Sequence, residues 1–536
     1  MMNFLLFATL LCLPLAESCE KERKLPEKEP APWTRYQTDL VVRSNALRRN
    51  ILYSVFLPAD YETATDKRYD VVYLLHGLGD DHGSWNGKYL HISTTLQQLE
   101  NRGTIAPKIY VMPQGFNSYY VNAYDGSFDY MDFFVEEFIP FIDGNYRTIA
   151  ERGHRAIAGY SMGGFGAMVM AAKNPDLFIA TMPLSMSLCQ YERYTTEASN
   201  SDGWDKQWGW IFGGVGSKGD ARITDYYKEH CPYYYFTEAS APSFGKMHWW
   251  LDCGDDEEQL LIANDRVHRQ MRDLGIKHEF RVRNGAHTSD YWRSAMESAL
   301  PWLETLLDGG QYPDTEQANV DTGSFEGRTE ELTVGGSTVK VYLSQQYAPE
   351  AERENTLLLA GHDGYTDKEL NGIANALTLA TYNRPCVLAC LDTSSESVDL
   401  DAVTAALVEK YRIGGSAYRI GLGFGEGADP LWRYSAENME ETDNEGKTTA
   451  AGVLGSLFLI DGNADASACT PNGKTFYYIV TTDEGTHYRS SGEMYELCKK
   501  KGTTYEYRVR NGASGYDAVL ACFAATVSDI KAKIKN

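Results

Sequence analysis

The chain has 536 residues, of which 43% are hydrophobic, and its formal net charge is −24 at neutral pH. This length exceeds what one hydrophobic core usually supports, so two or more domains are expected. The strong negative charge repels phosphate backbones and argues against a nucleic-acid partner. Aromatic residues make up 12% of the chain, and their rings suit sugars and phenolic acids as well as ordinary packing.

The N-terminal end carries an apolar segment over residues 4–16 that is too short to span a bilayer. It lies where a signal peptide would, although no Lys or Arg precedes it. We therefore expect residues 1–18 to be a signal peptide and the protein to be secreted, periplasmic or at the cell surface. Cleavage before Cys19 would leave a cysteine at the new N-terminus, so a lipoprotein-type lipid anchor at Cys19 stays open.

Two polar stretches divide the remaining chain. Residues 19–34 are charged and carry prolines, which predicts a tether. Residues 309–323 are polar, acidic and rich in turn formers, which predicts a linker. The expected domains therefore cover residues 35–308 and 324–536. The cysteines form neither a CxxC pair nor a His/Cys cluster with metal spacing, so free buried thiols are expected and no metal site is predicted. A disulfide formed after export stays open.

An apolar run over residues 71–75 ends in His76-Gly77-Leu78-Gly79. The run is β-branched at its start and predicts a buried strand. Glycines after such a strand let a backbone N–H point into a catalytic site, so we expect the N–H of Leu78 to be one oxyanion donor. His76 is expected to brace the loop rather than to titrate during catalysis.

The most informative stretch is Gly159-Tyr160-Ser161-Met162-Gly163. A short apolar run precedes it and a helix-forming run, residues 165–173, follows it, so the predicted context is strand, tight turn and helix. That context predicts a nucleophile elbow, in which the turn lifts the Ser161 hydroxyl clear of the sheet. The N–H of Met162, at the start of the helix, is the second expected oxyanion donor.

A third motif lies downstream, where a strand-like run over residues 249–254 stops in four acids, Asp255 to Glu258. A helical stretch follows, and then His287. The order Ser, acid, His is the one expected for an α/β-hydrolase. Three motifs at strand ends, in this order, are far more specific than any one of them.

At these motifs, HGLGDDHGSW, GYSMGG, LDCGDD and RVRNGAHTSDYW, the chain resembles the esterase D/feruloyl esterase family, also grouped as carbohydrate esterase family 1. The resemblance covers about residues 35–308. It implies an α/β-hydrolase fold, Ser161 as nucleophile, His287 as general base and no cofactor. It also implies substrates such as feruloyl or acetyl esters on plant xylan.

The acid of the triad stays open between two residues. The family spacing, Gly-x-x-Asp after Gly254, falls on Glu257, and a shift of one residue falls on Asp256. Either carboxylate could orient the imidazole of His287. In the implied mechanism His287 takes the Ser161 proton, an acyl-enzyme forms, and water releases the acid.

The second half repeats the first without its reactive groups. The run over residues 508–513 repeats residues 281–286 letter for letter, and residues 419–427 resemble residues 155–163. Gly425 then stands at the position of Ser161 and Ser514 at that of His287. Carried back without a gap, the repeat places Asp483 and Glu484 on Asp256 and Glu257. We expect a smaller, degenerate α/β-hydrolase-like domain that is inactive, and its role stays open between stabilisation or dimerisation, polysaccharide binding or shaping of the cleft, and a new activity.

The function predicted from these residues is a secreted serine carboxylesterase acting on feruloylated or acetylated xylan. Two alternatives remain: a small-ester or thioester hydrolase of the S-formylglutathione hydrolase type, and a non-catalytic carbohydrate-binding protein. A long insert over residues 187–245 carries many aromatic residues, which could grip a ferulate ring or simply pack the insert onto its own domain.

Overall fold

The computed structural model describes residues 34–313 and 325–535, apart from residues 189, 197–202, 258, 346, 351–353, 381–385, 395–397 and 443–445. The expected signal peptide, the tether up to residue 33 with Cys19, and residues 314–323 of the expected linker lie outside the described residues. In the described part of the chain, no helix combines the length and the apolar character needed to cross a membrane.

The first half of the molecule is built on a mostly parallel sheet whose strands are β1 (Tyr36–Ser44), β2 (Arg49–Phe56), β3 (Val71–Leu75), β4 (Ile109–Pro113), β5 (Arg155–Tyr160), β6 (Ala180–Leu184), β7 (His248–Gly254) and β8 (Glu279–Arg283). Their order is β1-β2-β4-β3-β5-β6-β7-β8, and β1 and β2 run antiparallel at the edge. This is the strand order of the α/β-hydrolase fold, so the predicted fold class is confirmed for this half.

The second half repeats that topology. Its strands are β9 (Arg328–Val334), β10 (Ser337–Leu343), β11 (Thr356–His362), β12 (Cys386–Asp392), β13 (Arg419–Phe424), β16 (Ser456–Ile460), β17 (Phe476–Thr482) and β18 (Tyr505–Arg510). Their order, β9-β10-β12-β11-β13-β16-β17-β18, matches the first half strand for strand. A separate two-stranded sheet, β14 (Asn438–Thr442) with β15 (Thr448–Gly452), belongs to this half alone.

Helices cover both faces of each half. The longer ones in the first half are α1 (Ile92–Asn101), α3 (Ile139–Asn145), α4 (Met162–Lys173), α9 (Gln259–Asp273) and α10 (Ser289–Leu307). Those of the second half are α11 (Asp367–Ala380), α12 (Leu400–Tyr411), α13 (Ala428–Tyr434), α14 (Tyr488–Lys501) and α15 (Gly515–Lys533). Helices α1 and α10 share one buried apolar cluster with the first half of the sheet, whereas α3, α4 and α9 share another. In the second half α11 and α15 lie on one face, and α12, α13 and α14 on the other.

Short helical segments make up the rest. They are α2 (Tyr130–Asp132), α5 (Tyr191–Thr196), α6 (Trp210–Phe212), α7 (Asp225–His230) and α8 (Pro232–Tyr235), the π segments Ser84–Lys88, Phe133–Phe138 and Asp205–Gly209, and the 3-10 turns Arg152–His154, Gly219–Arg222, Ala241–Lys246, Ser416–Tyr418, Gly425–Gly427 and Ala466–Ala468. Helices α5 to α8 belong to the insert between β6 and β7, which the second half lacks.

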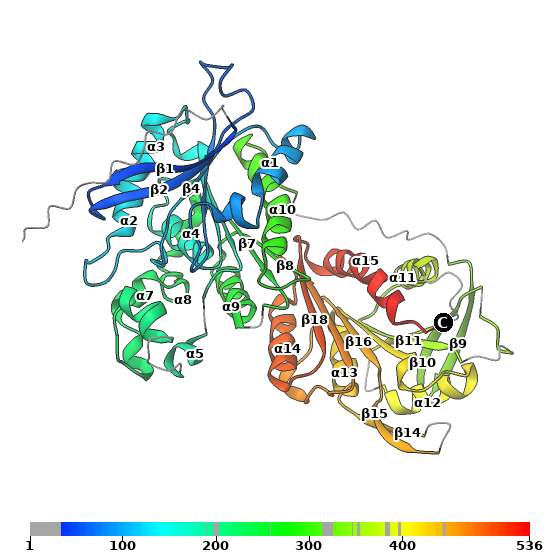
Figure 1. Ribbon diagram of the computed structural model, residues 1–536. Helices are drawn as coiled ribbons and strands as arrows, with labels where there is room; N and C mark the ends of the chain where they lie inside the picture. Colours follow the sequence, from blue (N-terminus) through cyan, green and yellow to red (C-terminus); the bar gives the residue numbers. More distant parts are fainter. Residues whose placement is uncertain are drawn as a thin grey trace, which may run out of the picture.

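The two halves join edge to edge into one 16-stranded sheet (Figure 1). Strand β8 runs antiparallel to β18, and Val282 lies opposite Val509. Beside this junction α9 packs against α14, and one buried apolar cluster continues from the first half into the second. The two halves are therefore held together as a continuous core and a continuous sheet.

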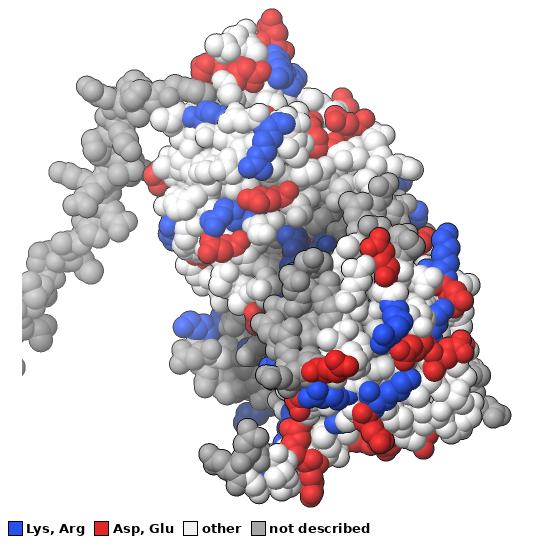
Figure 2. All heavy atoms as spheres, turned by 90° about the vertical axis from the view of Figure 1, so that its right-hand side faces the viewer, with Lys and Arg blue, Asp and Glu red and all other residues white. Residues whose placement is uncertain are grey.

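Charged side chains of both signs are interspersed over the face of the molecule seen in Figure 2. The net negative charge therefore does not gather into one acidic patch on that face. The cysteines in the described part of the chain are free thiols, and all of them except Cys469 are buried.

Candidate active site

Ser161 lies in the turn between β5 and α4, where the sequence predicts the elbow. Its φ of 56° and ψ of −119° lie in a region that residues other than glycine rarely adopt, at a cost of about 1–3 kcal/mol. The flanking glycines are a steric requirement. A Cβ at Gly159 would lie 2.1 Å from the Gly163 carbonyl oxygen, and a Cβ at Gly163 would lie 2.2 Å from that of Leu75. The strained turn thus presents the hydroxyl at the carboxyl end of β5.

His287 is placed between the hydroxyl and a carboxylate. Its Nε2 lies 2.9 Å from Ser161 Oγ, and its Nδ1 lies 2.8 Å from Glu257 Oε2. The imidazole is 36% exposed, whereas the side chain of Glu257 is fully buried. A hydroxyl, an imidazole and a carboxylate joined in this order can move a proton from the hydroxyl and stabilise the resulting imidazolium.

The two candidate acids have different surroundings. The buried carboxylate of Glu257 accepts hydrogen bonds from the Ser185 hydroxyl at 2.5 Å and from the Gly254 N–H at 2.9 Å, in addition to its contact with His287. Asp256 is exposed, and its backbone N–H donates to the Gly285 carbonyl at 3.0 Å. The structure therefore brings Glu257 to His287 and leaves Asp256 in solvent.

Trp292 and Ser185 support the imidazole and the carboxylate. The Trp292 ring meets the His287 ring edge-on, with centroids 4.8 Å apart, and it stacks on Tyr160 at 4.3 Å. Its indole N–H donates to Ser185 Oγ at 2.9 Å. Sequence reasoning missed Ser185. The available signal was its position directly after the apolar residues of β6, a strand end like those that carry Ser161 and the acid.

The loop after β3 is braced by His76, as expected from the sequence. His76 is buried, its Nδ1 lies 2.8 Å from the Gly77 carbonyl, and its Nε2 accepts from the Gly115 N–H at 2.8 Å. Burial lowers the pKa of His76, which favours the neutral ring that can donate at one nitrogen and accept at the other. The Gly79 N–H donates to Asn117 Oδ1 at 2.9 Å and fixes the far side of the loop.

The expected oxyanion donors lie at the ends of this loop and of the elbow. Met162 is the first residue of α4, where helix N–H groups have no partner within the helix. Among the described residues, neither the Leu78 N–H nor the Met162 N–H donates a hydrogen bond. Both groups therefore keep their donor capacity for a ligand.

The aromatic residues of the insert mostly pack on their own domain. Trp204 and Trp208 are buried, and the Trp208 ring lies 4.2 Å from that of Tyr119, centroid to centroid. Exposed aromatic side chains are found instead at Tyr124, 51% exposed, and at Tyr191, 43% exposed. The buried tryptophans of the insert therefore pack it onto its own domain, which is the second of the two hypotheses drawn from the sequence.

The register of the second half corrects the ungapped alignment. Arg281 of β8 lies opposite Asp252 of β7, whereas Arg508 of β18 lies opposite Val480 of β17. The connection between the two strands is thus one residue shorter in the second copy. Asp483 consequently matches Asp255, not Asp256, and Glu484 matches Asp256, not Glu257. Gly485 stands at the position of Glu257, so this half lacks the counterpart of each member of the Ser161–His287–Glu257 chain.

Within the part of the chain that the structure describes, no group of His, Cys, Asp and Glu side chains is arranged to hold a metal ion.

Comparisons with known proteins find esterases over the region that holds this site. Residues 44–303 match the family described as putative esterase. An esterase of Mycobacterium tuberculosis is 36% identical over 152 residues, which are 27% of this chain and 30% of that protein. An endo-1,4-beta-xylanase/feruloyl esterase of Xylanibacter ruminicola is 34% identical over 23% of this chain and 18% of its own length. An acetyl esterase of Caldicellulosiruptor saccharolyticus is 23% identical over 49% of this chain and 97% of its own length.

Among solved structures, a ferulic acid esterase is 29% identical and covers 51% of this chain and 98% of its own, with a TM-score of 0.43. The chain spans less than a third of the length of the Mycobacterium and Xylanibacter relatives. The matched region holds the elbow, the loop after β3, the acid and His287. Residues 44–303 of this chain thus match an esterase family over the region that carries the motifs.

Proposed function

We propose that the protein is a serine carboxylester hydrolase, and the observation that carries this proposal is the hydrogen-bonded chain Ser161–His287–Glu257. Ser161 Oγ attacks the ester carbonyl while His287 Nε2 takes its proton. Glu257 holds Nδ1 and stabilises the imidazolium that forms. The N–H groups of Leu78 and Met162 receive the developing oxyanion.

The second stage returns the catalyst to its starting state. The proton on His287 passes to the leaving alcohol, which departs and leaves an acyl group on Ser161 Oγ. Water then attacks this acyl-enzyme, with His287 as the base, and releases the carboxylic acid. The partly exposed His287 ring allows water to enter, while the buried Glu257 keeps the ring in one orientation.

The substrate class proposed is a feruloyl or acetyl ester of xylan. The names of two relatives support it, since one is a xylanase/feruloyl esterase and the other an acetyl esterase. We also propose that the second half is not a catalyst of this reaction, because Gly425, Gly485 and Ser514 offer no nucleophile, acid or base at the three matching positions.

The test is hydrolysis by the purified full chain. Ferulate release from methyl ferulate and acetate release from acetylated xylan are followed side by side, with S-formylglutathione as a thioester comparison. Wild-type protein is expected to release the acid from one of the two carboxylic esters over many turnovers, and the Ser161→Ala variant to release none. Equal trace turnover by both proteins would contradict the proposal, and preferential turnover of the thioester would replace the substrate class.

A further inference from the structure

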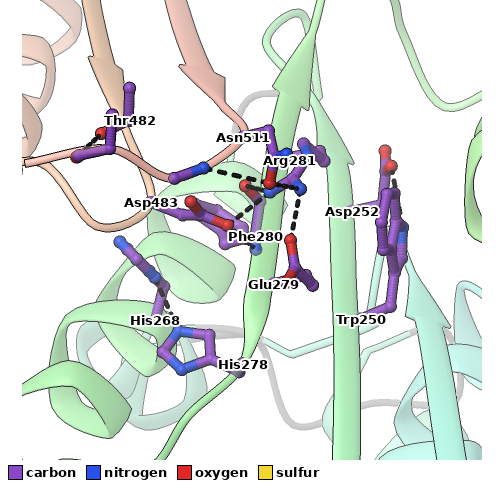
Figure 3. Close-up of polar contacts among 12 residues, drawn as sticks. Trp250, Asp252, His268, His278, Glu279, Phe280, Arg281, Thr482, Asp483 and Asn511 are labelled. Atoms are coloured by element: carbon purple, nitrogen blue, oxygen red, sulfur yellow. Dashed lines mark hydrogen bonds and ion pairs between the residues drawn. The ribbon is translucent and has the colours of Figure 1, made fainter. Parts of the chain in front are cut away.

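Two equivalent ion pairs, one formed by an arginine of each half, join the halves beside the β8–β18 junction. Arg281 of β8 binds Asp483, which follows β17, and Figure 3 shows this pair with Glu279 and Asn511 around it. Arg508 of β18 binds Asp255, which follows β7, and also Glu506. Both carboxylates are buried, and each also accepts a backbone N–H from the opposite half: Asp483 from Phe280 at 2.9 Å and Asp255 from Tyr507 at 3.4 Å.

The two pairs differ in what the second carboxylate oxygen does. Asp255 Oδ1 accepts the Gly285 N–H at 3.1 Å, two residues before His287. The matching oxygen, Asp483 Oδ1, has no hydrogen-bond partner among the described residues. In the second half the Gly512 N–H, which corresponds to that of Gly285, donates instead to Asn511 Oδ1 at 3.0 Å. Of the two pairs, only Arg508–Asp255 therefore holds a backbone group of the loop between β8 and His287.

Asp255 and Asp256 together hold both backbone polar groups of one residue in that segment, Gly285. The Asp255 carboxylate holds the Gly285 N–H, and the Asp256 N–H holds the Gly285 carbonyl at 3.0 Å. Gly285 has a φ of 148°, and a Cβ there would lie 2.6 Å from the Tyr291 ring. This close contact and the positive φ leave no room for a side chain, so only glycine fits at this position of the segment.

Packing alone does not fix the path of this segment. Asn284, Gly285 and Thr288 line a cavity of about 650 Å³ between the halves, which Tyr312 and Arg510 also border. A segment that borders an open pocket on one side has fewer protein contacts there to hold it. The hydrogen bonds from Asp255 and Asp256 therefore carry much of the restraint on the backbone before His287.

We propose that Arg508, in the non-catalytic half, is a positioning residue for the active site: it fixes the Asp255 carboxylate, which holds the Gly285 N–H and thereby the backbone that carries the imidazole of His287. This inference rests on the proposed function, because it needs Ser161 and His287 to be catalytic. The side-chain hydrogen bonds of Arg508 go to Asp255, Glu506 and the Tyr507 carbonyl, and not to Ser161 or His287. Arg508 acts by keeping Nε2 of His287 within reach of Ser161 Oγ, and small displacements of a catalytic group cost about 10²-fold in rate.

The test compares Arg508→Met with Asp483→Asn in the full-length protein. Each substitution breaks one of the two ion pairs, so both are expected to lower the Tm. The fall is expected to be larger in Arg508→Met, because Asp255 then loses its arginine partner, whereas Arg281 keeps Glu279 in Asp483→Asn. Only Arg508→Met is expected to lower kcat, by about tenfold to a hundredfold, with KM within about twofold of wild type. Loss of kcat by Asp483→Asn to the same extent, or an unchanged kcat in Arg508→Met, would overturn the proposal.

A double substitution tests whether Arg508 acts through Asp255. If it does, Arg508→Met/Asp255→Asn loses no more kcat than the more damaged of the two single variants, whereas multiplied losses would show independent effects and overturn the proposal. If Arg508→Met does not fold, Arg508→Lys takes its place, because it keeps a cation at the boundary but not the two-pronged guanidinium. Failure of the proposed function looks different, since wild type itself would then match Ser161→Ala.

Discussion

The two halves of the molecule keep the same elbow backbone but not the same chemistry. Ser161 has a φ of 56°, and Gly425, at the matching position, has a φ of 51°. The glycine spacing around it is also kept, because a Cβ at Gly427 would lie 2.4 Å from the backbone of Gly361, as a Cβ at Gly163 would meet Leu75. Close strand–helix packing therefore demands these glycines in both halves, whereas the hydroxyl is needed only where a reaction takes place.

A second pair of positions shows why the second half has no room for the triad acid. Ser185 and Asp461 each follow the strand beside the elbow strand, with φ values of 46° and 43°. Ser185 donates to Glu257, whereas a Cβ at Gly485, the counterpart of Glu257, would lie 2.5 Å from Asp461 Oδ1. The Asp461 carboxylate thus fills space that an acid at position 485 would need, so the loss is built into several positions and not into Gly425 alone.

The largest expected effect separates the halves outright. Ser161→Ala should lower kcat by at least about 10⁴-fold, because it removes the hydroxyl that His287 contacts and that forms the acyl-enzyme. Adding Gly425→Ser to Ser161→Ala should restore nothing, since positions 485 and 514 supply no acid or base. The measurement is ferulate or acetate release. Recovery of turnover in the double variant would show that the second half retains a working site.

The next effect distinguishes Glu257 from its neighbour. Glu257→Gln removes the charge that stabilises imidazolium and should lower kcat by about 10³- to 10⁴-fold. Asp256→Asn, one residue earlier and exposed, serves as the control and should stay within about twofold of wild type. Steady-state kcat for the two variants decides this, and a reversed result would assign Asp256 as the acid.

The buried carboxyl group of Asp255 gives a prediction for the pH dependence of stability. Burial raises the pKa of Asp255 from 3.8 to about 6, while Arg508 opposes the rise. The folded state then binds the proton more tightly than the unfolded state, so the free energy of unfolding falls as pH rises from about 4 to about 6. Asp255→Asn should remove this fall, which is at most about 3 kcal/mol. Urea unfolding of both proteins at several pH values measures the difference, and parallel curves would contradict it.

The smallest expected effect concerns the support of the acid. Ser185→Ala leaves the inner oxygen of Glu257 with the Gly254 N–H alone and should lower kcat by about tenfold. Thr181→Val on the same strand is the matched control, because its hydroxyl donates to the Ala167 carbonyl, away from Glu257. Equal kcat in the two variants, each measured with a folded protein, would remove Ser185 from the supporting network.

Much of this arrangement could be predicted from local sequence. The strand before His76, the elbow at Ser161 and the strand before the acids are short apolar runs with glycine at the turns, and they lie where the patterns place them. Each is a local signal, because glycine spacing and apolar runs report the steric needs of one turn or one strand. The match to the esterase family model covers these same motifs.

The rest depends on contacts between distant residues. The ungapped repeat matches Asp483 to the wrong acid because the connection from β17 to β18 is one residue shorter than the connection from β7 to β8. No sequence marker shows this difference in length, and only the strand register reveals it. The role of Ser185 depends on a neighbouring strand and on Trp292, more than a hundred positions away in the chain. The pairing of β8 with β18 joins two strands whose sequences carry no sign of which edge will meet.

That junction has a consequence for either half taken singly. Strands β8 and β18 are each the last of their own half, and each has the other on its outer side. A half released from the chain would bare a row of unsatisfied peptide groups there, the template on which β-rich proteins self-associate and aggregate. By carrying two copies in one polypeptide, the protein supplies each bare edge with a partner that dilution cannot remove.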